Sequence, residues 1–184
     1  MKETILLKFD DISIFTVTIA EWFANKTFIK EGDPNPHGIF RHAWWPTRFN
    51  FSDFHLLLKV LKNNFLENKG GYVVTRKASP FDKWILSQYL HGGFKGCKTG
   101  IEINGLKDDF FIHGDVIFQT SLSDETKKIM DEYYEKISDL QELFNFYKTG
   151  KKIPKTEIKV KIFRNLQLAE TLRNIVKKQF GEKK

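Results

Sequence analysis

One long amphipathic stretch in the second half of the chain constrains the fold more than any other feature. Its apolar residues recur at spacings of three and four: Ile129, Tyr133, Ile137, Leu140, Phe144 and Tyr147. This spacing places them on one face of an α-helix and predicts one long helix near 124–149. A helix with one apolar face must bury that face against another layer, so the rest of the chain has to supply one.

Several segments rich in β-branched and aromatic residues are predicted to supply that layer as strands. A hairpin closed through the sequence LKDD is expected within them. The predicted strands cover 4–9, 12–20, 72–77, 99–105, 110–120 and 156–163.

Further helices are predicted between these strands from their entry signals. Ser79 and Pro80 begin one helix, and Asn165 begins the last. Ser52 begins another, with an apolar face that continues to Phe65. The expected fold class is therefore α+β. It is a mostly antiparallel or mixed sheet of five to six strands, packed with four or more helices on one side.

The chain shows no repeat and no long Gly/Ser/Pro linker, so residues 1–184 are expected to form a single domain. The formal net charge is +7 and is unevenly distributed. Residues 99–147 carry four basic groups against 11 acidic ones, whereas residues 148–184 carry 12 against three. The basic segment 148–184 is expected to pack on the domain as a strand and a helix, where it can meet phosphates or pair with the acidic segment.

Composition also limits the chemistry and the location of the protein. Cys97 is the single cysteine, which excludes a disulfide framework and gives no zinc-ligand pattern, so we expect no cofactor. No apolar run approaches the ~18 residues of a membrane span, and we expect a cytoplasmic protein. The glycines in 91–100 follow a predicted helix instead of preceding one, so we interpret them as a helix stop and connection, not a phosphate loop.

The stretch GDPNPHGIFRHAWWPTR at 32–48 is too rich in proline for a helix and too aromatic for an ordinary loop. A connection of about 20 residues is usually functional, disordered or a missed element. We predict that it forms an ordered binding loop. Its candidate binding residues are His37, Arg41, His42, Trp44, Trp45 and Arg48.

Three uses suit this composition: stacking nucleobases while arginine reaches phosphate, a protein interface with Trp and Arg anchors, or a pocket for an anionic small molecule. The alternative is that the tryptophans are core and the arginines pair with the acidic segment 102–142. Because neighbouring residues in extended backbone point to opposite sides, we expect one of Trp44 and Trp45 to face inward and the other outward.

A second candidate set consists of Asp115, His113, Glu157 and Lys159. Asp115 with Glu157-x-Lys159 resembles the PD-(D/E)xK arrangement of nucleases, in which two acids hold a divalent metal and the lysine steadies the attacking water. His113 lies two residues from Asp115, on the same face of a predicted strand, where a carboxylate can orient an imidazole as a base.

The leading functional hypothesis is a non-catalytic interaction protein, such as an adaptor, inhibitor or immunity-type partner, that binds another protein through the 37–48 loop. The first alternative is a nucleic-acid or nucleotide binder that uses the same loop with the basic segment 148–184. The second is a metal-dependent hydrolase built on Asp115, His113, Glu157 and Lys159. No membrane partner is expected.

Overall fold

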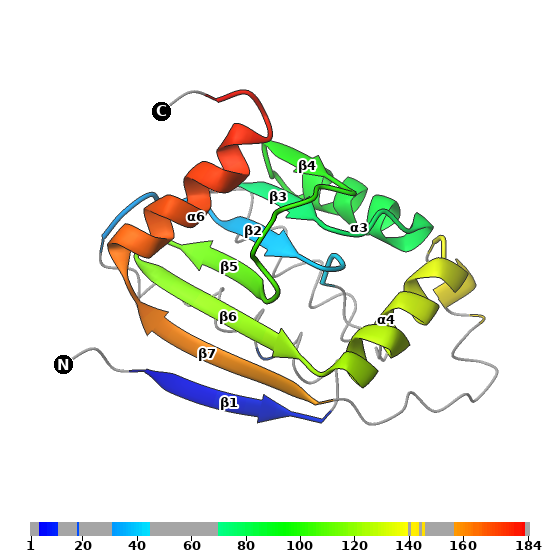
Figure 1. Cartoon of the computed structure of the whole chain (residues 1–184). Coiled ribbons are helices and arrows are strands. Elements are labelled where there is room, and N and C mark those ends of the chain that lie inside the picture. Colours follow the sequence, from blue (N-terminus) through cyan, green and yellow to red (C-terminus); the bar gives the residue numbers. More distant parts are fainter. Residues whose placement is uncertain are drawn as a thin grey trace.

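A mixed seven-stranded sheet organises the chain in the computed structural model, which describes residues 4–10, 18, 31–44, 70–139, 141–143, 145 and 157–182 (Figure 1). The strand order is β1-β7-β6-β5-β2-β3-β4. The strands are β1 (Ile5–Phe9), β2 (His37–Phe40), β3 (Tyr72–Thr75), β4 (Gly96–Lys98), β5 (Asp109–His113), β6 (Val116–Leu122) and β7 (Ile158–Arg164).

The sheet has an antiparallel half and a parallel half. The pairs β1–β7, β7–β6, β6–β5 and β5–β2 are antiparallel, whereas β2–β3 and β3–β4 are parallel. The carboxyl ends of β2 and β3 therefore meet at one edge of the sheet, together with the amino end of the antiparallel β5.

Helices cover both faces of the sheet, not one face as the sequence predicted. Helix α6 (Leu166–Lys178) buries Leu172 and Val176 against one face, in a cluster that includes Ile39, Ile112 and Ile117. Helices α3 (Pro80–His91) and α4 (Asp124–Lys136) pack on the other face, which holds the larger core cluster. In Figure 1, α6 crosses the upper strands and leaves the lower strands β7 and β1 uncovered in this view.

The predicted long helix near 124–149 is wrong in its extent. Helix α4 ends at Lys136, and Ile137 has extended backbone with φ −113° and ψ 124°. Asp139 then accepts a hydrogen bond from the backbone N–H of Glu142 at 2.9 Å, and residues 141–143 are helical again. Asp139 acts as an N-cap, so the local capping preference outweighs the continuing apolar periodicity.

The predicted hairpin at 99–120 is also placed differently. Its turn is at Gly114 and Asp115, because His113 pairs with Val116 across β5 and β6. Gly114 has φ +60°, the left-handed conformation that tight hairpin turns need and glycine adopts readily. The predicted segment 99–105 contains no strand, and the nearby short strand is β4, within the segment interpreted as a connection.

The α+β class and several elements are confirmed. Ser79 caps α3 with Pro80 as the first helical residue, and Asn165 caps α6. The sheet has seven strands where five to six were predicted. The predicted strand 12–20 and the helix that begins at Ser52 lie outside the described residues, except for Thr18, which is helical. Within the described part of the chain, every helix is too short or too polar to cross a bilayer.

Candidate functional site

The predicted binding loop begins as a buried strand. His37–Phe40 is strand β2, between β5 and β3, so the first part of the stretch is a missed element instead of a loop. His37, His42 and Trp44 are 0%, 1% and 7% exposed, and Trp44 packs on Phe40 with ring centroids 4.3 Å apart. Arg41 keeps part of its side chain at the surface. Trp45 and Arg48 lie outside the described residues.

Asp109 fixes the chain where it leaves β2. Its buried carboxylate accepts hydrogen bonds from the Arg41 backbone N–H at 2.6 Å, the Trp44 Nε1–H at 3.1 Å and Arg76 Nη2 at 2.5 Å. Burial raises the pKa of Asp109, while Arg76 and the two N–H donors act in the opposite direction. Asp109 is therefore an internal anchor that holds residues 41–44 against the sheet.

Asp82 anchors the same segment from the first turn of α3. It is fully buried and accepts from the Ala43 backbone N–H at 2.7 Å and from Ser79 Oγ at 2.8 Å. Its Oδ2 lies 2.8 Å from His42 Nδ1. The Tyr134 hydroxyl donates to the Ala43 carbonyl at 2.5 Å, and its ring lies 4.2 Å from the His42 ring. The contacts to His42 and Ala43 therefore join the turn to helices α3 and α4.

The outer part of this cluster centres on Asp131 of α4. Arg41 donates to it twice, from Nε to Oδ1 at 2.9 Å and from Nη2 to Oδ2 at 2.6 Å. His42 Nε2 lies 2.8 Å from Oδ1, and Lys77 Nζ lies 3.7 Å from Oδ2. Burial alone would raise the pKa of Asp131, but its contacts with Arg41 and His42 together lower it.

These contacts match the alternative interpretation of the stretch. Trp44 is a core residue, and Arg41 pairs with Asp131 of the acidic segment, as that interpretation requires. We name the group formed by Arg41, His42, Lys77 and Asp131 the strand-end cluster. It lies at the carboxyl ends of parallel strands, where open α/β sheets commonly bind ligands.

The proposed hydrolase residues are not brought together. Asp115 lies at the turn before β6 and pairs with Arg164 at 2.7 Å, whereas Glu157 precedes β7 and pairs with Lys159 at 3.2 Å. Because Val116 pairs with Arg164 at one end and Leu122 with Ile158 at the other, the two acids are separated by about 20 Å of strand. His113 ends β5, directly before the turn that contains Asp115. No group of three metal-ligating side chains occurs in the described residues.

A separate basic surface lies on the exposed side of β1 and β7, on the sheet face to which α6 also packs. Directly opposed residues of paired strands share a face, and Lys8 opposes Lys159, while Leu6 opposes Lys161. The side chains of Lys8 and Lys159 are 67% and 66% exposed, and Leu6 is 74% exposed. We name this surface, with Phe163, the lysine face.

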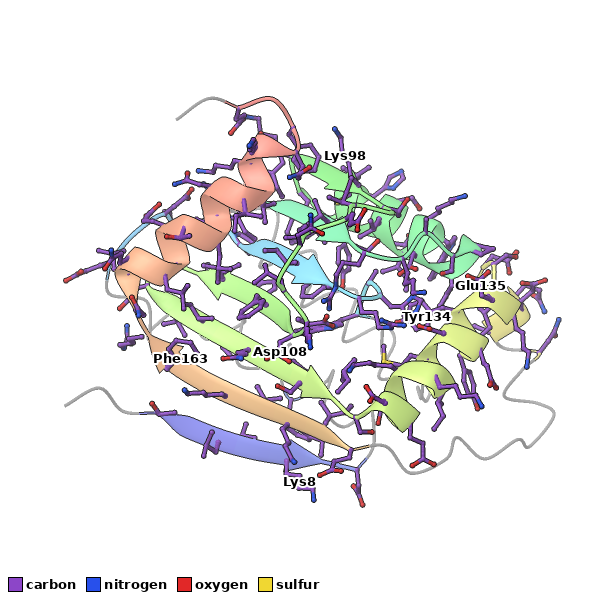
Figure 2. The ribbon with its side chains drawn as sticks, viewed as in Figure 1. Lys8, Lys98, Asp108, Tyr134, Glu135 and Phe163 are labelled. Carbon is purple, nitrogen blue, oxygen red and sulfur yellow. The ribbon has the colours of Figure 1, made fainter. Side chains whose placement is uncertain are left out.

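The lysine face combines cations with one aromatic ring. Lys161 Nζ lies 5.0 Å from the centre of the half-buried Phe163 ring, a cation–π contact. Figure 2 shows Phe163 and Lys8 projecting from β7 and β1. Glu157 forms ion pairs with Lys8 at 3.3 Å and with Lys159 at 3.2 Å, and these two lysines lower the pKa of its carboxyl group.

Sequence reasoning missed Asp109 and Asp131, the carboxylates around which the strand-end cluster is arranged. It also missed the part of the lysine face that β1 contributes. Asp109 looked like a turn residue of the LKDD sequence, and Asp131 like a polar residue of an amphipathic helix. The predicted strand at 156–163 is confirmed as β7, in which Lys159 and Lys161 alternate with buried Ile158, Val160 and Ile162. Only the pairing with β1 adds Lys8 to that surface.

Comparisons with solved structures give only remote likenesses. No known protein family and no curated relative matches the chain. A solved structure of TrmBL2, described as an archaeal chromatin protein with a novel mode of DNA binding, aligns with a TM-score of 0.43 and 8% sequence identity. The alignment covers 96% of this chain and 52% of that one, so this chain spans about half the length of TrmBL2. A similarity this low carries no inference about function.

Proposed function

We propose that the protein binds single-stranded nucleic acid through the lysine face, without catalysis. The observation that carries this proposal is the exposed sheet surface on which Lys8, Lys159 and Lys161 lie beside Leu6 and Phe163. Proteins that bind single strands combine cations that follow the phosphates with apolar rings on which bases stack. The lysine face offers both on rigid strands.

The arrangement of the lysines supports an anionic partner. Lys159 and Lys161 are two residues apart, about 7 Å along the strand. Lys8 and Lys159 are directly opposed, at a separation of roughly 5 Å between Cβ atoms, where like charges destabilise a sheet. A phosphate backbone would relieve that repulsion, and Glu157 relieves it only in part, since one carboxylate contacts two of the three lysines.

The protein-binding hypothesis is weakened, because most of its described candidate residues are buried in the core. His37, His42 and Trp44 are core residues. Of the candidate binding residues that the structure describes, Arg41 alone keeps a substantial exposed part, and it is ion-paired. The basic segment named in the nucleic-acid alternative contributes Lys159, Lys161 and Phe163. The geometry therefore favours that alternative over the leading hypothesis, with the lysine face in place of the loop.

The test is a titration of a labelled 12-nucleotide single strand, followed by fluorescence anisotropy between 20 and 200 mM salt. We expect binding at low salt that weakens as salt rises. Lys159→Gln or Lys161→Gln should make the salt dependence shallower, by about 0.7 in log–log slope for each phosphate that the variant no longer neutralises. Lys83→Gln on α3 is the matched control, because Lys83 is exposed on a different element. Absence of binding at 20 mM salt, or an equally weakened control, overturns the proposal.

A variant with the opposite sign sharpens the test. Glu157→Gln removes the carboxylate that competes with phosphates for Lys8 and Lys159, so affinity should increase roughly two- to tenfold at low salt. An interface that avoided this surface would show no gain.

A further inference from the structure

In the strand-end cluster, three side chains with donor groups face the single carboxylate of Asp131. The Asp131 carboxylate has two oxygens, and Arg41 and His42 occupy them with three contacts between 2.6 and 2.9 Å. Lys77 Nζ is left at 3.7 Å from Oδ2, beyond hydrogen-bond distance, with its side chain 45% exposed. An anion with three or more oxygens could contact Arg41, His42 and Lys77 at the same time.

We propose that Arg41, His42 and Lys77 form a binding site for a phosphate-class oxyanion, and that Asp131 occupies this site as an internal substitute. The ligand would displace the Asp131 side chain, which is 32% exposed and can turn to solvent while α4 stays packed through Met130 and Tyr134. This site is separate from the lysine face and does not depend on the proposed function.

The His42 side chain and the backbone of Arg41 and Lys77 are held in place without Asp131. His42 is fixed through Nδ1 by the buried Asp82, and the Arg41 backbone N–H is fixed by the buried Asp109. The Lys77 backbone N–H donates to the Arg41 carbonyl at 2.9 Å, which ties the two strand ends together. Anion sites gain affinity when a second layer of contacts positions the donors in advance.

Charge at the cluster also favours an anion. Arg76 pairs with Asp109 and His42 contacts Asp82, so Arg41 and Lys77 together face the single charge of Asp131. A phosphate carries about −1.5 to −2 at pH 7. It would balance the two cations better than one carboxylate does, and the guanidinium of Arg41 already presents the paired donors that bind phosphate in a bidentate way.

The experiment compares Asp131→Asn with Asp124→Asn, a variant of another carboxylate on the same helix. Asp124 is exposed and pairs with Lys127 instead of the strand ends. The melting temperature is measured by circular dichroism against inorganic phosphate and pyrophosphate, with chloride at matched ionic strength as the reference. D131N should bind phosphate roughly tenfold more tightly than the wild type and be stabilised accordingly. Arg41→Gln in the D131N background should abolish this response.

An equal phosphate response in D131N and D124N, or no response in either, overturns the proposal. Should D131N not fold, pyrophosphate is titrated into the wild type and into Lys77→Gln. A stabilisation that K77Q reduces supports the site, while no stabilisation, or one that K77Q leaves unchanged, overturns it. Lys161→Gln is tested in parallel and should keep the phosphate response, which separates this site from the lysine face.

Discussion

Asp109 shows how much of the structure can depend on one carboxylate. It is 1% exposed and joins Arg41, Trp44 and Arg76, which come from two different strand ends. Asp109→Ala would leave the Arg76 cation and two N–H groups without their acceptor. We expect it to lower the free energy of unfolding by about 3–5 kcal/mol, measured by urea denaturation.

Asp108→Ala is the control for that change, because Asp108 is half-buried and its described contact is one hydrogen bond from Gln119. It should cost about 1 kcal/mol or less. Similar losses in the two variants would contradict the anchoring role of Asp109. Sequence alone could not separate these neighbours, since the partners of Asp109, which are Arg41, Trp44 and Arg76, lie far away along the chain.

His37 should make stability depend on pH. Burial lowers the pKa of its imidazole from the usual 6.5 to about 4, although a hydrogen bond to the Asn35 carbonyl opposes this. Between these two values the unfolded chain takes up a proton that the folded protein does not, so stability is complete above pH 6.5 and falls as pH drops toward 4.

The decrease should approach ~3 kcal/mol near pH 4, since one pKa unit corresponds to ~1.4 kcal/mol. The measurement is urea denaturation at pH 7, 5.5 and 4.5 for the wild type and His37→Gln. The variant should show a shallower decline over this range. Parallel curves for the two proteins would refute the assignment of this pH dependence to His37.

At the scale of elements, the caps of α3 and α4 should differ in strength. Ser123 Oγ accepts from the Thr126 backbone N–H at 3.1 Å, and Ser123→Ala should cost about 1 kcal/mol, as typical caps do. Ser79 caps α3 and also donates to the buried Asp82 at 2.8 Å. Ser79→Ala should therefore cost more, about 2 kcal/mol, in thermal or urea unfolding. Equal costs would mean that Asp82 does not need this donor.

Elements with strong local signals were predictable, and elements defined by pairing were not. Helices α3 and α6 have capping residues that identify their first turns in the sequence. Strand β2 has four residues, all buried, and begins directly after Pro36, so it shows no alternation to recognise. The end of α4 was missed because Leu140 and Phe144 continue the apolar spacing past the cap at Asp139.

For the whole molecule, the α+β class followed from the mixture of strand and helix patterns, whereas the layout of the sheet did not. The parallel half depends on β2 and β4, which are short and have weak propensity signals. Because these two strands were not predicted, the helices were expected on one face of a smaller sheet. The two sites follow from this layout, because parallel strand ends create the strand-end cluster and the antiparallel half supplies the lysine face.

The pairing of β1 with β7 has a consequence for the order of folding. Ile5 pairs with Ile162, which lies more than 150 residues later in the sequence. Contacts so distant in sequence form slowly, because a long loop must close before they can form. The lysine face needs both strands, so we expect it to be completed late in folding.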